Sequence, residues 1–146
     1  MVAPPIPANA LGAEPRVVLV DVRPERRALV GRVVDLALGS GTVVAEVATA
    51  SEAVAAMDRQ TIDTAIVEVQ LPVTEGLSVI AALRAARPEL MIVVCTFHDD
   101  KTTRKDAAAA GADIYLVKPV NARELRDALR SKRPGPLPDP ASSAQG

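Results

Sequence analysis

Aromatic residues are almost absent from this sequence. They make up 1% of its 146 residues, tryptophan does not occur, and Phe97 and Tyr115 are the two that remain. Because 49% of the residues are nevertheless hydrophobic, the core has to be built from Ala, Val, Leu and Ile. Cysteine and histidine are equally scarce, since Cys95 and His98 occur once each. A single cysteine excludes an internal disulfide and a zinc site made of several cysteines, so we expect a cytoplasmic protein without a metal centre.

Neither sign of charge dominates the chain. It carries 17 Lys and Arg against 18 Asp and Glu, a formal net charge of -1. Nucleic-acid binding through phosphate neutralisation usually needs a basic surface, so direct contact with DNA or RNA is not expected. No hydrophobic run approaches the roughly 20 residues of a membrane helix, and the first residues lack the pattern of an export signal. We therefore expect no membrane association.

Proline is concentrated near the two ends. Three prolines lie between residues 4 and 7, and four more alternate with other residues between 134 and 140. Segments of this composition do not supply a packed core. The sequence predicts disordered tails over residues 1–15 and 133–146 and a single domain over residues 16–132, whose length is typical of one domain.

Between the tails, short β-branched runs alternate with alanine-rich helical patterns. The expected strands cover residues 17–20, 43–47, 65–67, 91–95 and 114–117. Helical patterns follow each strand: from Pro24 to the glycines at 39 and 41, over 51–57, from the turn near Pro72 to before Pro88, around 107–110 after an Asp99-Asp100 cap, and over 121–132. Strands that are apolar throughout are typical of a sheet that is buried on both faces.

Five βα units in succession predict an α/β fold, with a parallel sheet covered by helices on both faces. Right-handed crossovers limit the topology to an open, doubly wound sheet. In such sheets, ligands bind at the carboxyl ends of the strands. Asp21, Glu68, Thr96 and Lys118 each lie at or just beyond an expected strand end, so they are the candidate site residues.

The residues around these positions resemble the receiver domain of two-component response regulators, over residues 16–132. Four motifs carry the resemblance, in order: Leu19-Val20-Asp21-Val22-Arg23-Pro24, Glu68-Val69-Gln70-Leu71-Pro72 with Gly76, Cys95-Thr96, and Gly111-Ala112-Asp113-Ile114-Tyr115-Leu116-Val117-Lys118-Pro119. The resemblance implies a flavodoxin-like, five-stranded sheet of order 2-1-3-4-5. It also implies an acidic pair that holds magnesium after the first strand and a phosphoacceptor after the third.

Further roles follow from the same resemblance. The Lys118–Pro119 bond is expected to be cis. Thr96 and Tyr115 match the switch pair of the family, in which the threonine engages the phosphoryl group and the aromatic ring moves inward. Tyr115 has a simpler alternative, that of an ordinary strand aromatic with its hydroxyl at the surface.

Two positions depart from the family pattern. Val22 stands where the second acid of the pair binds magnesium, and Glu68 stands at the phosphoacceptor position. Asp21, Glu68 and Lys118 leave one net negative charge, where the usual pocket has two. Magnesium prefers an octahedral set of oxygen ligands, so we expect weak or absent magnesium binding, no other cofactor and impaired phosphoryl transfer. The longer Glu68 side chain is expected to reach toward Thr96 and Lys118 and to imitate part of the phosphorylated state.

Two neighbouring side chains have two interpretations each. Arg23 either pairs with Asp21 or Glu68, in place of the metal, or is solvated in its loop. Phe97 follows Thr96, where the family generally has a small residue, and its ring either caps access to Glu68 or packs outward.

These observations favour a non-enzymatic, atypical receiver that signals through protein–protein interaction without aspartate phosphorylation. The partner surface is expected on the face of the fourth helix, fifth strand and last helix, or on the first helix, and a homodimer is possible. One alternative is a working phosphorelay receiver with a degenerate acceptor site. Another is a phosphatase with an aspartyl nucleophile, which needs a second acid where Asp21-Val22-Arg23 supplies Arg23.

Overall fold

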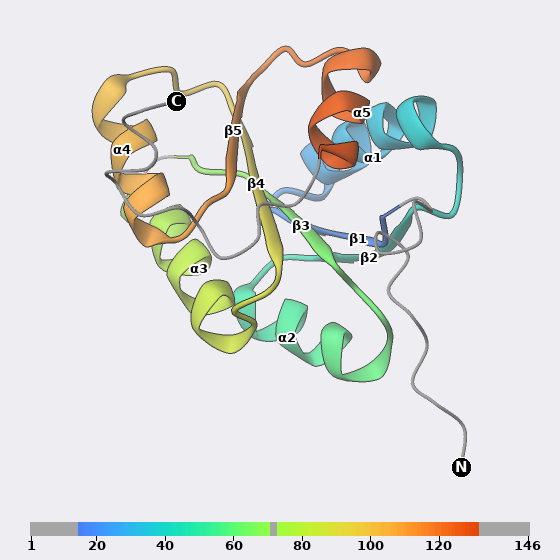
Figure 1. Ribbon diagram of the computed structural model, residues 1–146, viewed down its shortest axis with the longest axis horizontal. Helices are drawn as coiled ribbons and strands as arrows, with labels where there is room; N and C mark the ends of the chain where they lie inside the picture. Colours follow the sequence, from blue (N-terminus) through green and yellow to red (C-terminus); the bar gives the residue numbers. More distant parts are fainter. Residues whose placement is uncertain (1–14, 71–72, 132–146) are drawn as a thin grey trace.

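The computed structural model describes residues 15–70 and 73–131. Its elements are β1 (Val17–Val20), α1 (Pro24–Leu38), β2 (Val43–Val47), α2 (Ala50–Arg59), β3 (Thr64–Val67), α3 (Val73–Ala86), β4 (Met91–Thr96), α4 (Lys101–Ala110), β5 (Ile114–Val117) and α5 (Ala122–Arg130). The strands pair in parallel in the order β2-β1-β3-β4-β5 (Figure 1). The predicted doubly wound, flavodoxin-like fold is therefore confirmed.

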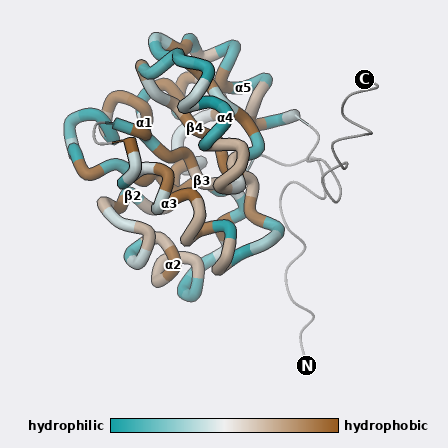
Figure 2. The backbone as a smooth tube through the Cα atoms, turned by 90° about the vertical axis from the view of Figure 1, so that its left-hand side faces the viewer, coloured by the Kyte–Doolittle hydropathy of each residue, from teal (hydrophilic) through white to brown (hydrophobic). Residues whose placement is uncertain are grey.

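The sheet separates two layers of helices. In Figure 1, α1 and α5 lie side by side on one face of the sheet, and α2, α3 and α4 cover the other. Successive side chains of a strand point to opposite faces, so Val18 and Val20 of β1 pack with α2, α3 and α4. Val17 and Leu19 pack with α1 and α5. Figure 2 shows hydrophobic residues along β3 and β4, with more hydrophilic residues in the outer turns. Both cores are aliphatic, as the composition predicts.

Side-chain caps fix where several helices begin. The Asp100 carboxylate accepts the N–H of Thr103 at 2.9 Å, which confirms the predicted cap of α4. Hydrogen bonds from Thr103 also hold the pKa of Asp100 below its ordinary value. The prediction that α2 begins at Ser51 is wrong, because the helix begins at Ala50 and Thr49 Oγ1 accepts the N–H of Glu52. Thr49 and Ser51 can each cap a helix, and only the backbone geometry shows that Thr49 is the residue that does so.

Arg84 ties the end of α4 to the rest of the domain. Its guanidinium donates to the carbonyl oxygens of Leu90 and Gly111 at 2.7 Å each, and to the Asp113 carboxylate at 2.7 Å. Gly111, with a φ of 123°, ends α4 in a conformation that favours glycine. The Gly111-Ala112-Asp113 motif therefore positions β5, and with it Lys118, against β4.

Some expectations lie outside the described residues. These are most of the first predicted tail (residues 1–14), the second tail (133–146), Leu71 and Pro72. None of the helices in the described part of the chain combines the length and hydropathy that a membrane span requires.

Candidate functional site at the carboxyl edge of the sheet

Glu68 and Lys118 form a buried ion pair. Glu68 follows β3 and Lys118 follows β5, so the two side chains meet across the end of β4. The Lys118 Nζ donates to Glu68 Oε1 at 2.6 Å, and the two side chains are 11% and 6% exposed. The Lys118–Pro119 peptide bond is cis, as the resemblance implies. Two residues that are 50 positions apart in sequence are thus joined at the predicted edge.

Asp21 is held by a second ion pair, which the sequence did not predict. Arg26, in the first turn of α1, donates from Nε to Oδ2 at 3.1 Å and from Nη2 to Oδ1 at 3.0 Å. The backbone N–H of Arg23 adds a bond of 2.9 Å to Oδ1. The Asp21 side chain is 4% exposed. Both of its oxygens are therefore engaged, and Arg26 also donates to the side-chain oxygen of Gln70.

Of the two interpretations of Arg23, the structure supports the solvated side chain and not the pairing with Asp21 or Glu68. Its guanidinium is 61% exposed and lies 3.8 Å from Glu25. Arg23 is the extended N-cap residue of α1, whereas Arg26 lies within the first helical turn. Side chains in a helix lean toward its N-terminus, so Arg26 points back at the end of β1. The signal that could have identified Arg26 is its place two residues beyond Pro24, the first residue of the helix.

Arg27 adds a third basic group beneath the site. Its Nη1 donates to the backbone oxygen of Asp21 at 2.6 Å, and its Nε lies 4.0 Å from a Glu46 carboxylate oxygen. Arg27 Nε and Glu68 Oε2 are both buried without a hydrogen-bond partner among the described residues. They belong to residues that line the same cavity of about 10 Å³. One oxygen of Glu68 thus stays uncommitted.

The charges of the site cancel. Arg26 and Lys118 neutralise the carboxylates of Asp21 and Glu68, each at hydrogen-bond distance. The sequence had led us to expect one net negative charge here, because Arg26 was not counted. In a partly desolvated pocket such pairs interact more strongly than they would in water.

Thr96 and Tyr115 are both tied to the loops around the site. The Thr96 hydroxyl is fully buried and donates to the Val69 carbonyl oxygen at 2.5 Å. Glu68 therefore reaches Lys118 but not the Thr96 hydroxyl. The Tyr115 hydroxyl donates to the His98 carbonyl oxygen at 2.7 Å, and the Arg104 guanidinium lies 4.9 Å from the ring centroid.

The half-buried Tyr115 ring packs against the core beside α2, α3 and α4. Its hydroxyl is hydrogen-bonded to the backbone, and the role of Tyr115 as the aromatic member of a switch pair stays a prediction. Burial, followed by the nearby Asp100 charge, raises the pKa of Tyr115 above its ordinary value. The hydroxyl therefore stays protonated and able to donate at neutral pH.

Phe97 and Cys95 flank the Glu68–Lys118 pair. The Phe97 side chain is 67% exposed, and its ring centroid lies 5.4 Å from Lys118 Nζ. The ring thus borders the ion pair without being enclosed. Cys95 is buried in β4, and burial is the main reason that its pKa is raised from 9.0 to about 11. It remains a neutral thiol at neutral pH and packs as a small hydrophobic residue.

The donor set at this edge does not fit magnesium, the ion that a receiver pocket implies. Val22 offers no oxygen ligand, both oxygens of Asp21 accept bonds from Arg26, and Glu68 Oε1 accepts from Lys118. Across the described ranges, no three His, Cys, Asp or Glu side chains gather in a group that could hold a metal ion. An incoming cation would find one carboxylate oxygen without a partner, Glu68 Oε2, and would have to displace Arg26 or Lys118 to gain another.

Comparison with known proteins identifies the protein family that has this fold and a site at this edge of the sheet. Residues 17–130 match the family model described as the response regulator receiver domain, and the chain belongs to this family. Receiver domains are signalling modules of two-component systems.

Individual relatives agree with this assignment. The chain is 35% identical to the transcriptional regulatory protein TcrA of Mycobacterium tuberculosis strain H37Rv over 132 residues, which cover 90% of this chain and 51% of TcrA. A LuxR-family two-component response regulator from Aurantimonas sp. SI85-9A1 superposes with a TM-score of 0.71 at 28% identity, over 89% of this chain and 94% of that one.

A CheY-like receiver domain protein from Methanospirillum hungatei JF-1 shares the fold. Its TM-score is 0.68 at 23% identity, and the match covers 92% of this chain and all of that chain. The chain spans about half the length of TcrA, so what the rest of that protein does is not transferred to this one.

Proposed function

We propose that this chain is an atypical receiver that signals through protein contacts without being phosphorylated. The observation that carries the proposal is the pair of buried ion pairs, Asp21 with Arg26 and Glu68 with Lys118. The two cations occupy both oxygens of Asp21 and one oxygen of Glu68, which a metal ion or a phosphoryl group would otherwise use. Phosphoryl transfer relies on cations to neutralise the transferring group, and here the available cations already have partners.

Magnesium binding is proposed to be weak or absent for the same reason. The ion accepts little besides oxygen ligands in near-octahedral geometry and gives up its water reluctantly. Val22 removes one carboxylate, and the bidentate Arg26 competes for the other. A pocket without net negative charge also provides little attraction for a divalent cation.

Glu68 is proposed to hold the domain in one signalling state. Its carboxylate accepts a hydrogen bond from Lys118, and in receiver domains the lysine at this position contacts the phosphoryl group. The Tyr115 ring lies inward, and its hydroxyl is bonded to the backbone. The imitation of phosphate is partial, since a carboxylate carries one charge and two oxygens. If the domain has one fixed signalling state, the strength of its signal depends on how much of the protein is present and not on phosphorylation by a kinase.

A working phosphorelay is the second candidate, and one observation favours it. Glu68 Oε2 has no hydrogen-bond partner in the part of the chain described, so one carboxylate oxygen is left that can act as a nucleophile. This candidate requires magnesium, whereas the first does not.

A magnesium titration followed by NMR separates the two candidates. For the unmodified chain, millimolar magnesium is expected to leave the amide signals of Asp21 and Glu68 unmoved. Val22→Asp restores a carboxylate and is expected to tighten binding at least tenfold, whereas Leu36→Asp places the same charge on an 80% exposed side chain and has no such effect. Saturable shifts at Asp21 and Glu68 in the unmodified chain support the phosphorelay instead.

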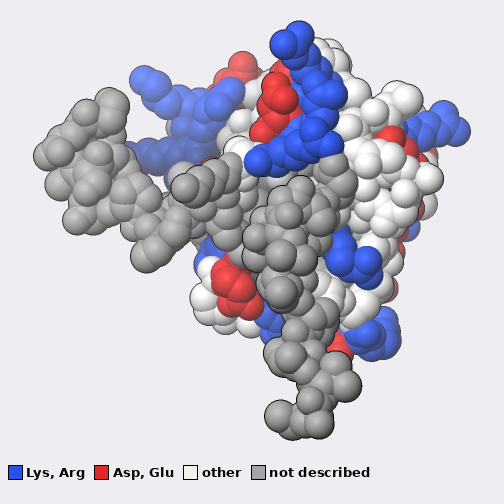
Figure 3. Space-filling model, turned by 45° about the vertical axis from the view of Figure 1, so that its right-hand side comes forward, with Lys and Arg blue, Asp and Glu red and all other residues white. Residues whose placement is uncertain are grey.

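The first helix is the proposed partner surface. Of the four exposed large hydrophobic residues among those described, Leu29 and Leu36 lie on α1 and Val22 lies two residues before its first residue, Pro24. An exposed apolar surface of this kind is typical of protein contacts. Figure 3 shows one face of the molecule, on which a group of Lys and Arg side chains lies at the upper left and others stand beside Asp and Glu at the top. A second copy of the chain is one partner that this surface can take.

A further inference from the structure

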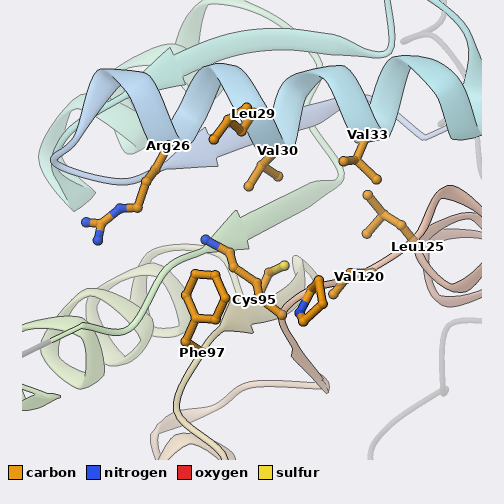
Figure 4. A pocket seen from close by; sticks show the side chains of 10 residues that line it. Arg26, Leu29, Val30, Val33, Cys95, Phe97, Val120 and Leu125 are labelled. Carbon is orange, nitrogen blue, oxygen red and sulfur yellow. The ribbon is translucent and has the colours of Figure 1, made fainter.

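A pocket separates α1 from the segment that joins β5 to α5. Its volume is about 210 Å³, which exceeds the cavity of roughly 150 Å³ that encloses one benzene molecule. Figure 4 shows side chains of α1 facing Cys95, Val120 and Leu125 across the gap. The apolar lining consists of Leu29, Val30, Val33, Cys95, Phe97, Pro119, Val120 and Leu125.

The floor and mouth of this pocket differ in exposure. Cys95 and Leu125 are buried, whereas Leu29 and Phe97 are exposed and lie at its opening. A concave apolar surface with a closed floor and an open mouth is typical of sites for small molecules. A group that enters it gains contact with side chains that a flat partner surface does not reach.

The charged side chains that line the pocket are all basic. Arg26 and Lys118 belong to the lining, whereas their partners Asp21 and Glu68 do not. Figure 4 shows Arg26 at the end of the gap near the start of α1. The Lys118 ammonium has three N–H donors and gives one to Glu68 at 2.6 Å. A ligand in the pocket therefore meets the spare N–H donors of Lys118 and the Arg26 side chain at one end, each already paired with a carboxylate outside the lining, and apolar surface elsewhere.

We propose that this pocket binds a small organic monocarboxylic acid with an apolar body. The carboxylate lies beside Lys118 and Arg26, and the body lies between α1 and Leu125. The volume encloses about eight non-hydrogen atoms, by proportion to the benzene-sized cavity, and the open mouth lets a slightly longer ligand extend out of it. This site shares Arg26 and Lys118 with the two ion pairs but does not include the Asp21 and Glu68 carboxylates, and ligand binding is measured without any phosphorylation assay.

Octanoate is a suitable probe for the full-length chain. In an NMR titration it is expected to bind saturably, with shifts centred on Val30, Val33 and Val120 and with intermolecular NOEs from its terminal methyl group to the methyl groups of Val30 and Val33. Octan-1-ol has the same chain without the charge and is expected to bind at least tenfold more weakly, because it lacks a charge-assisted bond.

Two matched variants test the location. Val33→Phe fills the pocket and is expected to weaken octanoate binding at least tenfold, whereas Leu36→Phe adds similar bulk to the same helix outside the lining and leaves binding unchanged. If Val33→Phe fails to fold, the NOEs in the unmodified chain still show whether octanoate binds in this pocket. Three results would each overturn the proposal: no saturable octanoate binding, equal affinity for octan-1-ol, or NOEs that map to residues outside the pocket. These results are expected if the pocket instead receives a side chain of a docked protein.

Discussion

The buried pair of Glu68 and Lys118 determines the character of the site at the scale of single residues. Each charge has lost most of its water, and each is compensated only by a partner at close range. A buried ion pair adds little net stability compared with a hydrophobic pair, but removal of one member leaves the other without compensation. The pair therefore fixes geometry and is costly to break from one side.

Glu68→Ala should destabilise the domain by about 3 kcal/mol, because it leaves the Lys118 ammonium buried without its partner. The free energy of unfolding in urea measures this loss. Glu25→Ala, which removes a carboxylate from an exposed pair with Arg23, should change it by less than about 0.5 kcal/mol. Equal effects of the two substitutions would show that the buried pair is energetically unimportant.

The Cys95 thiol predicts a pH dependence. Burial raises its pKa from 9.0 to about 11, so between these values the folded chain keeps a proton that the unfolded chain releases. This contribution to stability is complete below pH 9 and is lost as the pH rises toward 11. Unfolding measured at pH 8 and pH 11 should show the unmodified chain losing about 2 kcal/mol more than Cys95→Ala. If the unmodified chain and Cys95→Ala lose the same free energy of unfolding between pH 8 and pH 11, the proposed contribution of the Cys95 thiol is contradicted.

The sequence predicted which side chains meet at the site but not how each is paired. Asp21, Glu68 and Lys118 follow apolar strands, and the carboxyl ends of parallel strands share one edge. The bond of Arg26 to Asp21 depends on the direction in which α1 leaves the sheet, which no local pattern records. The backbone path after β4, which anchors Tyr115 to His98, is equally a tertiary property.

At the scale of elements, Gly76 shows how closely α3 approaches the loop after β3. A Cβ atom at this position would lie 2.9 Å from the Cα atom of Val69, a contact with backbone that cannot move aside easily. The same Val69 backbone carries the carbonyl oxygen to which Thr96 donates. The packing of α3 thus helps to hold the loop that presents Glu68.

Gly76→Ala is expected to destabilise the domain by about 1–3 kcal/mol through this overlap. Gly31→Ala is a matched control in α1, since its Cβ would meet Leu19 at an ordinary 3.5 Å. Helix propensity alone favours alanine by roughly 0.5–1 kcal/mol, so Gly31→Ala should be neutral or stabilising. Thermal unfolding of both variants measures the contrast, and a stabilised Gly76→Ala variant would be inconsistent with the close approach.

Element positions were more predictable from sequence than their ends. The strands appear as continuous apolar runs, and the predicted and observed strands agree to within one residue at each end, as for β4, which continues to Thr96. Helix starts depended on which of several capping residues makes the bond, as Thr49 and Ser51 illustrate. Apolar periodicity reports burial directly, whereas caps depend on backbone geometry.

At the scale of the whole molecule, a receiver-domain fold carries a site whose charged side chains are paired with one another. The family assignment rests on residues 17–130, and the five parallel strands place the four candidate residues at one edge. Asp21 and Glu68 retain the acidic character of that edge, while Arg26 and Lys118 remove its net charge. The fold is thus retained while the proposed means of control is changed.

Incubation with acetyl phosphate and magnesium, followed by mass spectrometry, shows whether this site accepts a phosphoryl group. The unmodified chain and Glu68→Asp are expected to remain unphosphorylated, because Val22 and Arg26 still disfavour the metal. Val22→Asp combined with Glu68→Asp is expected to accept phosphate at position 68, which shows that the assay can detect the reaction. Phosphate mapped to Glu68 or Asp21 of the unmodified chain would contradict the account.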